Sequence, residues 1–370
     1  MSTPSQAEVR RMIAAAGTIV VKVGSSSLTQ PSGHLDPDKL DALAAALAQV
    51  RLMGGRVVLV SSGAIAAGFG PLGFDSRPVD VATQQATAAV GQGLLMARYE
   101  TAFGRFGIRV GQILITAEDT IRATQYRNVE RTLDRLLDLG VVPIINENDS
   151  LASNEIRFGD NDTLAALVAC LVSADLCVTL SDIEGLYTAN PSIDPNARFV
   201  PRVEKIDAAI IASAGDSSSA VGTGGMITKI RSSRILMTAG IPSVICSGAD
   251  EGALARLARG EQVGTLFVPP HARTDIAPRK LWIALGDAAH GSVSVDDGAA
   301  RALVERGSSL LPVGITAVEG QFEAGDVLDV RDAGGFVLAR GIAEAGSDEL
   351  QLAAGRQQRE IAGNHLLQAL

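Results

Sequence analysis

The stretch Val141-Val-Pro-Ile-Ile-Asn-Glu-Asn-Asp-Ser150 carries the clearest fold signal in this chain. A short run of apolar, mostly β-branched residues stops abruptly at a row of polar ones, which is the pattern of a buried strand reaching the end of a sheet. In open α/β sheets, ligands bind at the edge formed by the carboxyl ends of the strands. The stretch therefore predicts an α/β fold with a functional site where this strand ends.

A second polar cluster follows in Phe158-Gly-Asp-Asn-Asp-Thr-Leu164. Asp160, Asn161 and Asp162 come just before an apolar, helix-forming run at residues 163–171, where a helix cap would explain one Asp. Two Asp and one Asn beside the first cluster exceed what a cap requires. They indicate a site that handles an amine, a metal ion or lysine side chains.

Composition limits the classes of function. The 370 residues allow two or three domains, and a 46% hydrophobic content supports sizeable cores. A formal net charge of -9 and the lack of any basic run argue against a nucleic-acid-binding surface. Neither a signal peptide nor a run of about 18 apolar residues for a membrane span is evident, so a cytoplasmic protein without membrane contact is expected.

Cysteines and histidines give no metal-binding pattern. The cysteines lie in apolar surroundings without paired ligand spacing, so we expect buried, reduced thiols. The histidines are scattered and form no HxxxH or comparable motif, so a zinc site is not expected. These residues are Cys170, Cys177 and Cys246, and His34, His271, His290 and His365.

From residue 18 to about residue 268, short β-branched runs alternate with longer Ala- and Leu-rich amphipathic stretches. This alternation predicts crossover connections and a largely parallel sheet that is covered by helices on both faces. The expected strands are residues 18–23, 56–61, 109–115, 141–145, 176–180 and 242–246. The expected helices are residues 37–53, 84–106, 120–139, 164–173 and 225–239.

The pattern changes at residues 269–278, where three prolines and little apolar content predict a linker. Beyond it, short strand-like runs are separated by Gly or Asp turns, with one short helix at residues 298–306, which predicts a small β-rich barrel. The expected domains are residues 1–268, the linker, and a module with a C-terminal tail at 279–370. Its expected strands are residues 281–285, 292–295, 315–319, 327–330 and 336–340.

Four loops have features of phosphate-binding segments. Val20-Val-Lys-Val-Gly-Ser-Ser-Ser27 places Lys22 in a strand before a Gly/Ser turn, and Val60-Ser-Ser-Gly-Ala-Ile-Ala-Ala-Gly68 runs from a strand into small residues. Neither matches GxxxxGK[ST]. A strand ending in Gly-Ser, as in the first, is most often only a turn, and close packing of a helix on the sheet explains the second equally well.

The third loop, Gly222-Thr-Gly-Gly-Met-Ile-Thr-Lys-Ile230, has three glycines opening a helix that carries Lys229, so free amides and one ammonium group can bind an anion. In the fourth, at residues 179–191, Asp182 follows an apolar strand and a turn begins at Asn190. An ordinary loop explains the fourth alone. Four such loops on one sheet nevertheless favour a phosphate site.

Six motifs in this order closely resemble the glutamate 5-kinase family, amino-acid kinases that open proline biosynthesis: KVGSSSLT, SSGAIAAG, PIINENDS, FGDNDTLAAL, SDIEGLYTANP and GTGGMITK. Residues 295–300 and 306–315 resemble the PUA domain that many bacterial members carry. The resemblance covers nearly the whole chain. It implies a three-layer αβα sandwich and transfer of the γ-phosphoryl group of ATP, with Mg²⁺, to the side-chain carboxylate of L-glutamate.

The resemblance also implies roles for individual residues. Lys22 and Lys229 correspond to lysines that touch the transferring phosphoryl group, and Asp162 to the carboxylate that orients them. The glutamate-binding positions correspond to Ser62, Asp149 and Asn161. The ATP-binding positions correspond to Lys22, Ser181, Asp182, Thr223, Gly224, Gly225, Met226, Ile227, Thr228 and Lys229, where many members have Thr in place of Ser181.

The family further implies a homo-oligomer (dimer or tetramer), proline as a feedback inhibitor, and glutamyl phosphate reductase as the downstream partner. No protein metal site is implied, because the phosphates of ATP mainly carry the Mg²⁺. Three alternatives stay open: a kinase of the same fold for N-acetylglutamate or aspartate, a non-catalytic sensor, and an RNA-binding protein acting through its PUA module. The 8 Lys and Arg against 13 Asp and Glu at residues 278–370, a net of -5, argue against the last.

Overall fold

The computed structural model describes residues 6–354 except 75, 77, 117–118, 120–122, 152–160, 215–224, 271–288, 307–309 and 336. The chain forms two compact units, one built on an eight-stranded sheet and the other on a four-stranded sheet. Most of the predicted linker and the strand expected at 281–285 lie outside the described residues.

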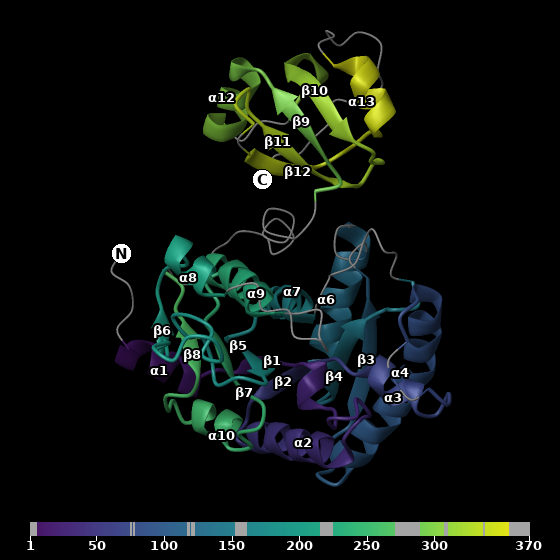
Figure 1. Ribbon diagram of the computed structural model, residues 1–370, viewed down its shortest axis with the longest axis vertical. Coiled ribbons are helices and arrows are strands. Elements are labelled where there is room, and N and C mark those ends of the chain that lie inside the picture. Colours follow the sequence, from purple (N-terminus) through teal and green to yellow (C-terminus); the bar gives the residue numbers. More distant parts are fainter. Residues whose placement is uncertain are drawn as a thin grey trace. The chain divides into compact units, whose positions relative to one another are not determined.

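The larger sheet has the strand order β3-β4-β2-β1-β5-β7-β8-β6 (Figure 1). Neighbouring strands are parallel except β7 and β8, which are antiparallel. The largely parallel sheet predicted from the alternating pattern is therefore confirmed. Its strands are β1 (Thr18–Val23), β2 (Arg56–Ser61), β3 (Val110–Ile115), β4 (Val142–Glu147), β5 (Leu176–Ser181), β6 (Arg202–Val203), β7 (Ser243–Ser247) and β8 (Thr265–Phe267).

Helices cover both faces of this sheet (Figure 1). On one face α2 packs against α4 and α10, and on the other α7 packs against α9. The helices are α1 (Gln6–Ala14), α2 (Pro37–Leu52), α3 (Ala64–Phe69), α4 (Val81–Gly104), α6 (Ala123–Asp138), α7 (Asn161–Leu171), α8 (Ala208–Ser213), α9 (Met226–Thr238) and α10 (Ala253–Ala258). None of the described helices is long and apolar enough to cross a membrane.

The alternation of side chains along β1 explains how one strand serves two layers. Val21 points into the apolar core that also contains Leu47 of α2 and Leu95 of α4. Lys22 points the opposite way, where its ammonium group meets α7. An apolar strand with a single lysine therefore joins the main core to a polar site on the other face.

The three cysteines are free and buried, as expected from their apolar surroundings. Burial raises the pKa of Cys246 to about 12, with the carboxylate of Asp250 adding to the effect. A thiol with such a high pKa stays protonated and unreactive at neutral pH. The thiol of Cys246 is therefore a packing group.

The second unit has the strand order β10-β9-β11-β12, with β9 and β11 parallel and the outer pairs antiparallel. Val293, Leu328 and Val330 from the sheet pack with Phe322 and Leu350 in a core of its own. The elements are β9 (Gly291–Val295), α12 (Asp297–Arg306), β10 (Ile315–Gly320), β11 (Val327–Arg331), β12 (Val337–Ile342) and α13 (Ser347–Ala353). A small β-rich module with its own core is thus confirmed.

Candidate active site

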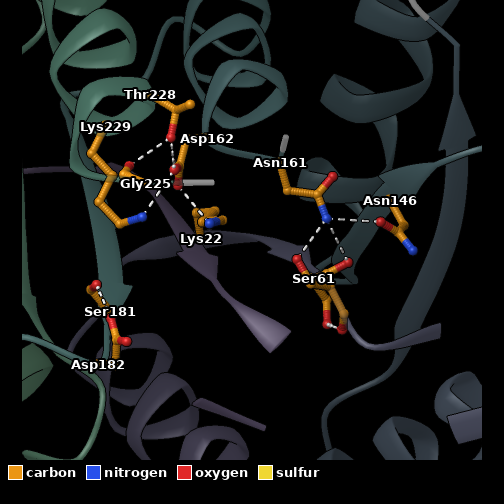
Figure 2. A network of polar contacts seen from close by, with 11 residues as sticks. Lys22, Ser61, Asn146, Asn161, Asp162, Ser181, Asp182, Gly225, Thr228 and Lys229 are labelled. Carbon is orange, nitrogen blue, oxygen red and sulfur yellow. Dashed lines mark hydrogen bonds and ion pairs between the residues drawn. The ribbon is translucent and has the colours of Figure 1, made fainter. Parts of the chain in front are cut away.

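Four adjacent parallel strands, in the order β4-β2-β1-β5, bring their carboxyl ends to one edge of the larger sheet. Lys22 lies in β1, Ser62 follows β2, Asn146 lies in β4 and Ser181 ends β5. The N-termini of α7 and α9 lie at the same edge and add Asp162. Segments about two hundred residues apart in the chain therefore meet in one site (Figure 2).

A buried carboxylate joins two lysines in this site (Figure 2). The Nζ of Lys22 lies 2.5 Å from Oδ1 of Asp162, and the Nζ of Lys229 lies 3.1 Å from Oδ2. Asp162 is only 1% exposed and both lysines are buried. The structure thus brings together the three residues that the sequence assigns to phosphoryl transfer.

Thr228 connects Asp162 with the start of α9. Its hydroxyl oxygen lies 2.9 Å from Oδ2 of Asp162 and 2.8 Å from the carbonyl oxygen of Gly225. A hydroxyl has one proton, so Thr228 donates to one of these acceptors at a time. Gly225 is the N-cap of α9 and has no side chain, so the first amides of this helix are left without a side-chain cap.

Opposing effects set the pKa of the Asp162 carboxyl. Burial raises this pKa, whereas the charges of Lys22 and Lys229 and hydrogen bonds from Lys22 and Thr228 lower it. The combined lowering effects exceed that of burial, so the pKa lies below the ordinary value of 3.8. Asp162 is therefore ionised at neutral pH.

The lysine cluster has an excess of positive charge. Two ammonium groups share one carboxylate, and no other ion pair of either lysine is found among the described residues. Buried charge is unfavourable unless it is compensated, so the cluster should favour an anion that supplies the missing negative charge. A phosphoryl group meets this requirement.

A second polar network surrounds Asn161, the first residue of α7 (Figure 2). Its Nδ2 lies 2.8 Å from Oγ of Ser62, 3.0 Å from Oδ1 of Asn146 and 3.4 Å from the carbonyl oxygen of Ser61. Asn146 in turn donates from Nδ2 to Oε1 of Gln92 at 3.0 Å. Ser62 and Asn161, two of the residues predicted to bind glutamate, therefore contact each other.

Side chains from α4 support this network from behind. Gln92 contacts Asn146, and the hydroxyl of Tyr99 lies 2.7 Å from Oγ of Ser61. Both Gln92 and Tyr99 are buried. We did not predict either from sequence, because a polar residue in an Ala-rich amphipathic helix carries no local sign of its partner 38 or 54 residues away. Asn146 was part of the recognised cluster but was not singled out.

The remaining predicted site residues are placed as follows. Ser181 ends β5 and donates from Oγ to Oδ1 of the exposed Asp182 at 2.9 Å. Asp149 lies in the turn after β4. The first residues of α9 include Met226 and Ile227. Asp160, Thr223 and Gly224 lie outside the described residues.

Two explanations were open for the small residues after β2: a ligand-binding loop and close packing of a helix. Gly63 has a φ of 105°, a left-handed conformation that glycine adopts readily, and it forms the N-cap of α3. A Cβ at Gly68 would overlap the backbone carbonyl of Thr87 in α4. Close helix packing therefore requires Gly68, whereas Ser62 and Gly63 lie at the edge of the sheet where ligands bind.

The described residues of this site offer few protein ligands to a divalent ion. The described residues contain no group of three or more His, Cys, Asp or Glu side chains arranged to hold a metal ion. The buried carboxylate of Asp162 already binds two lysines.

Comparison with known proteins agrees with this geometry. Residues 17–247 match the Amino acid kinase family, and residues 291–363 match the PUA domain. The chain is 66% identical to Glutamate 5-kinase of Bifidobacterium longum (strain DJO10A), covering 98% of this chain and 94% of that protein. It is 50% identical to Glutamate 5-kinase of Streptomyces avermitilis, over 95% of this chain and 93% of that protein. It is 49% identical to Glutamate 5-kinase of Thermobifida fusca, over 96% of this chain and 90% of that protein. The chain belongs to the amino acid kinase family.

Proposed function

We propose that this chain transfers the γ-phosphoryl group of ATP to the side-chain carboxylate of L-glutamate, giving L-glutamyl 5-phosphate in the first step of proline biosynthesis. The observation that carries the proposal is the buried cluster of Lys22, Asp162 and Lys229, which has one more positive than negative charge. Relatives named Glutamate 5-kinase match over almost the whole chain at up to 66% identity and support the choice of substrate.

The chemistry needs no general base. The attacking side-chain carboxylate of glutamate has a reference pKa of about 4.3 and is ionised at neutral pH. Phosphoryl transfer then depends on aligning the attacking and leaving oxygens and on neutralising the charge of the transferring group. Lys22 and Lys229 supply that charge, and Asp162 holds the two ammonium groups at a fixed separation.

The nucleotide occupies the side of the site formed by β5 and α9. Ser181, Asp182 and the run from Thr223 to Lys229 are proposed to bind ATP, with the backbone amides at the start of α9 facing its phosphates. A Mg²⁺ ion bound with the nucleotide would neutralise part of the phosphate charge. These assignments rest on the end of β5 and the start of α9, which lie at the same sheet edge as Lys22.

Glutamate occupies the side formed by β2, β4 and α7. Ser62 and Asn161 contact each other there, and Asp149 follows the same strand that carries Asn146. We assign Asp149 to the substrate ammonium group, because a carboxylate pairs with an ammonium but gains nothing from the uncharged amide of N-acetylglutamate. This assignment favours free glutamate over its N-acylated form.

The alternatives have less support. A kinase specific for N-acetylglutamate or aspartate, a sensor or an RNA-binding protein is not favoured by the consistent naming of the relatives. A homo-oligomeric state, inhibition by proline and delivery of the product to glutamyl phosphate reductase are part of the proposal, on the basis of the family resemblance.

Removing either lysine tests the proposal. Lys22→Met and Lys229→Met should each lower kcat for glutamate-dependent ADP formation by about 10²-fold or more, because each loses a charge that stabilises the transition state. Lys205→Met is the matched control, since Lys205 is exposed in a loop, and its kcat should stay at the wild-type value. Near-normal kcat in a folded variant at either buried position would exclude that lysine from the mechanism.

A further inference from the structure

Gln92 contacts the proposed substrate site only through another side chain. It is 8% exposed on α4, and its Oε1 accepts a hydrogen bond from Nδ2 of Asn146, itself 4% exposed. The Nε2 of Gln92 is buried and has no hydrogen-bond partner among the described residues. A buried donor without a partner is unfavourable. This orientation of the Gln92 amide must therefore be favoured by the other hydrogen bonds of the network.

The side-chain amides of Gln92, Asn146 and Asn161 form a chain of hydrogen bonds, and the group that fixes its direction lies at the Asn161 end. The backbone carbonyl of Ser61 can only accept, so Asn161 must turn its Nδ2 toward it, at 3.4 Å. The same Nδ2 then donates to Oδ1 of Asn146, which leaves Nδ2 of Asn146 to donate to Oε1 of Gln92. One fixed acceptor therefore sets the direction of three successive side-chain amides.

The reverse direction would fit the backbone less well. It would pair Nε2 of Gln92 with Oδ1 of Asn146, but it would also place the carbonyl oxygen of Asn161 against the carbonyl oxygen of Ser61. Two acceptors at that distance repel each other. In the observed direction the oxygen of Asn161 is turned away from these partners (Figure 2).

We propose that Gln92 is a positioning residue for substrate selection. By accepting from Asn146, it completes the row of hydrogen bonds whose direction the Ser61 carbonyl sets, and it holds Asn161 so that its carbonyl oxygen faces the substrate and accepts a hydrogen bond from the α-ammonium group. This inference rests on the proposed function. It deepens that function by assigning the recognition of a free amino group to the amide of Asn161, which Gln92 supports through Asn146.

The packing of α4 keeps Gln92 fixed. The neighbouring Gly91 lies so close to α3 that a Cβ there would overlap the backbone carbonyl of Ala64. Two turns further along α4, Tyr99 bonds to Ser61, whose carbonyl sets the direction of the chain. The same helix therefore supports both ends of the network.

Comparing glutamate with glutarate, which lacks the amino group, tests the inference. In Gln92→Met, Asn146 loses its acceptor and holds Asn161 less firmly, so KM for glutamate should rise about tenfold, the equivalent of one hydrogen bond to a charged group. The inhibition constant of glutarate and KM for ATP should stay within about twofold of wild type. Thr87→Val is the matched control, because Thr87 is buried on the same helix and its hydroxyl has no hydrogen-bond partner among the described residues.

The outcomes separate a selective role from a structural one. A parallel rise for glutamate and glutarate, or unchanged KM for glutamate, would overturn the inference. Gln92→Glu retains the oxygen acceptor, so its selectivity for glutamate over glutarate should be no lower than wild type. A loss of selectivity in Gln92→Glu would overturn the inference even if Gln92→Met does not fold. No glutamate turnover by the wild type would instead refute the proposed function.

Discussion

Asp162 stabilises the folded state as well as the reaction. With this carboxylate ionised, the two buried ammonium groups have a partner, and without it they repel each other in a buried site. Its carboxyl pKa is lower in the folded chain than the ordinary value of 3.8. A group with a lowered folded pKa stabilises the fold above its unfolded pKa, and that contribution is lost as pH falls toward the folded value.

Asp162→Asn should therefore lower the free energy of unfolding at pH 7 by about 3–5 kcal/mol and also reduce kcat. The difference in stability from wild type should shrink as the pH falls below about 4, because the unfolded wild-type chain then binds a proton at Asp162 that the folded chain, with its lowered pKa, still resists. Chemical denaturation over a pH series measures this difference. Asp134→Asn, at an exposed position of α6, is the control and should have little effect. A stability difference that is constant down to pH 2 would contradict the account.

The sequence predicted the residues of the lysine cluster but not those that support the second network. Lys22, Asp162 and Lys229 stand in motifs at strand or helix ends, where chemistry is expected. Gln92 and Tyr99 stand inside a helix whose polar residues normally face solvent. Their burial depends on how α4 packs, which is a tertiary feature that no local pattern shows.

Among the secondary-structure elements, α3 and α4 pack unusually closely because each has a glycine at their contact. A Cβ at Gly68 would overlap the backbone of α4, and one at Gly91 would overlap the backbone of α3. Small residues on both helices allow the backbones to touch. This contact places α4 directly behind the end of β2 and fixes the position of Gln92 and Tyr99.

Gly91→Ala should force α3 and α4 apart, lowering the free energy of unfolding by about 2–3 kcal/mol and raising KM for glutamate. Gly93→Ala on the same helix is a stringent control, because an added Cβ at Gly93 meets no atom within 4 Å. Alanine is the better helix former, so Gly93→Ala should stabilise the chain by roughly 0.5–1 kcal/mol. Thermal or urea unfolding of both variants measures the contrast, and equal stabilities would contradict the packing argument.

The main strands were predictable because burial on both faces gives β-branched runs. Six expected strands match β1 to β5 and β7 within two residues at each end. β6 and β8, at two and three residues, were missed because such short segments carry no periodic signal. The six-residue α3 was missed as well, since its Gly- and Ala-rich sequence is equally typical of a loop.

At the scale of the whole molecule, the chain separates its proposed chemistry from its second unit. Every proposed catalytic and binding residue lies before residue 230, in the unit built on the larger sheet. The second unit has a separate core. We therefore propose that the boundary at residues 269–278 divides a kinase domain from a module that is not needed for phosphoryl transfer.

Truncation after Pro270 should leave a folded chain whose kcat for glutamate stays within about threefold of the full-length value, because no proposed catalytic residue is removed. Circular dichroism and glutamate-dependent ADP formation provide the measurements. Inhibition by proline can differ between the truncated and the full-length chain without contradicting this prediction. A soluble, folded truncation without phosphoryl transfer at saturating ATP and glutamate would show that the two units form one catalytic entity.

The most direct test of the central claim is the turnover of free L-glutamate, N-acetylglutamate and L-aspartate by the full chain with Mg-ATP, with hydroxylamine present to trap an acyl phosphate. The account predicts the γ-hydroxamate of glutamate as the product. It also predicts a kcat/KM for glutamate at least about 10²-fold above that for the other two, because only glutamate offers both an ammonium group and a side chain of the required length. Equal or faster turnover of N-acetylglutamate or aspartate, or ATP hydrolysis without hydroxamate, would contradict it.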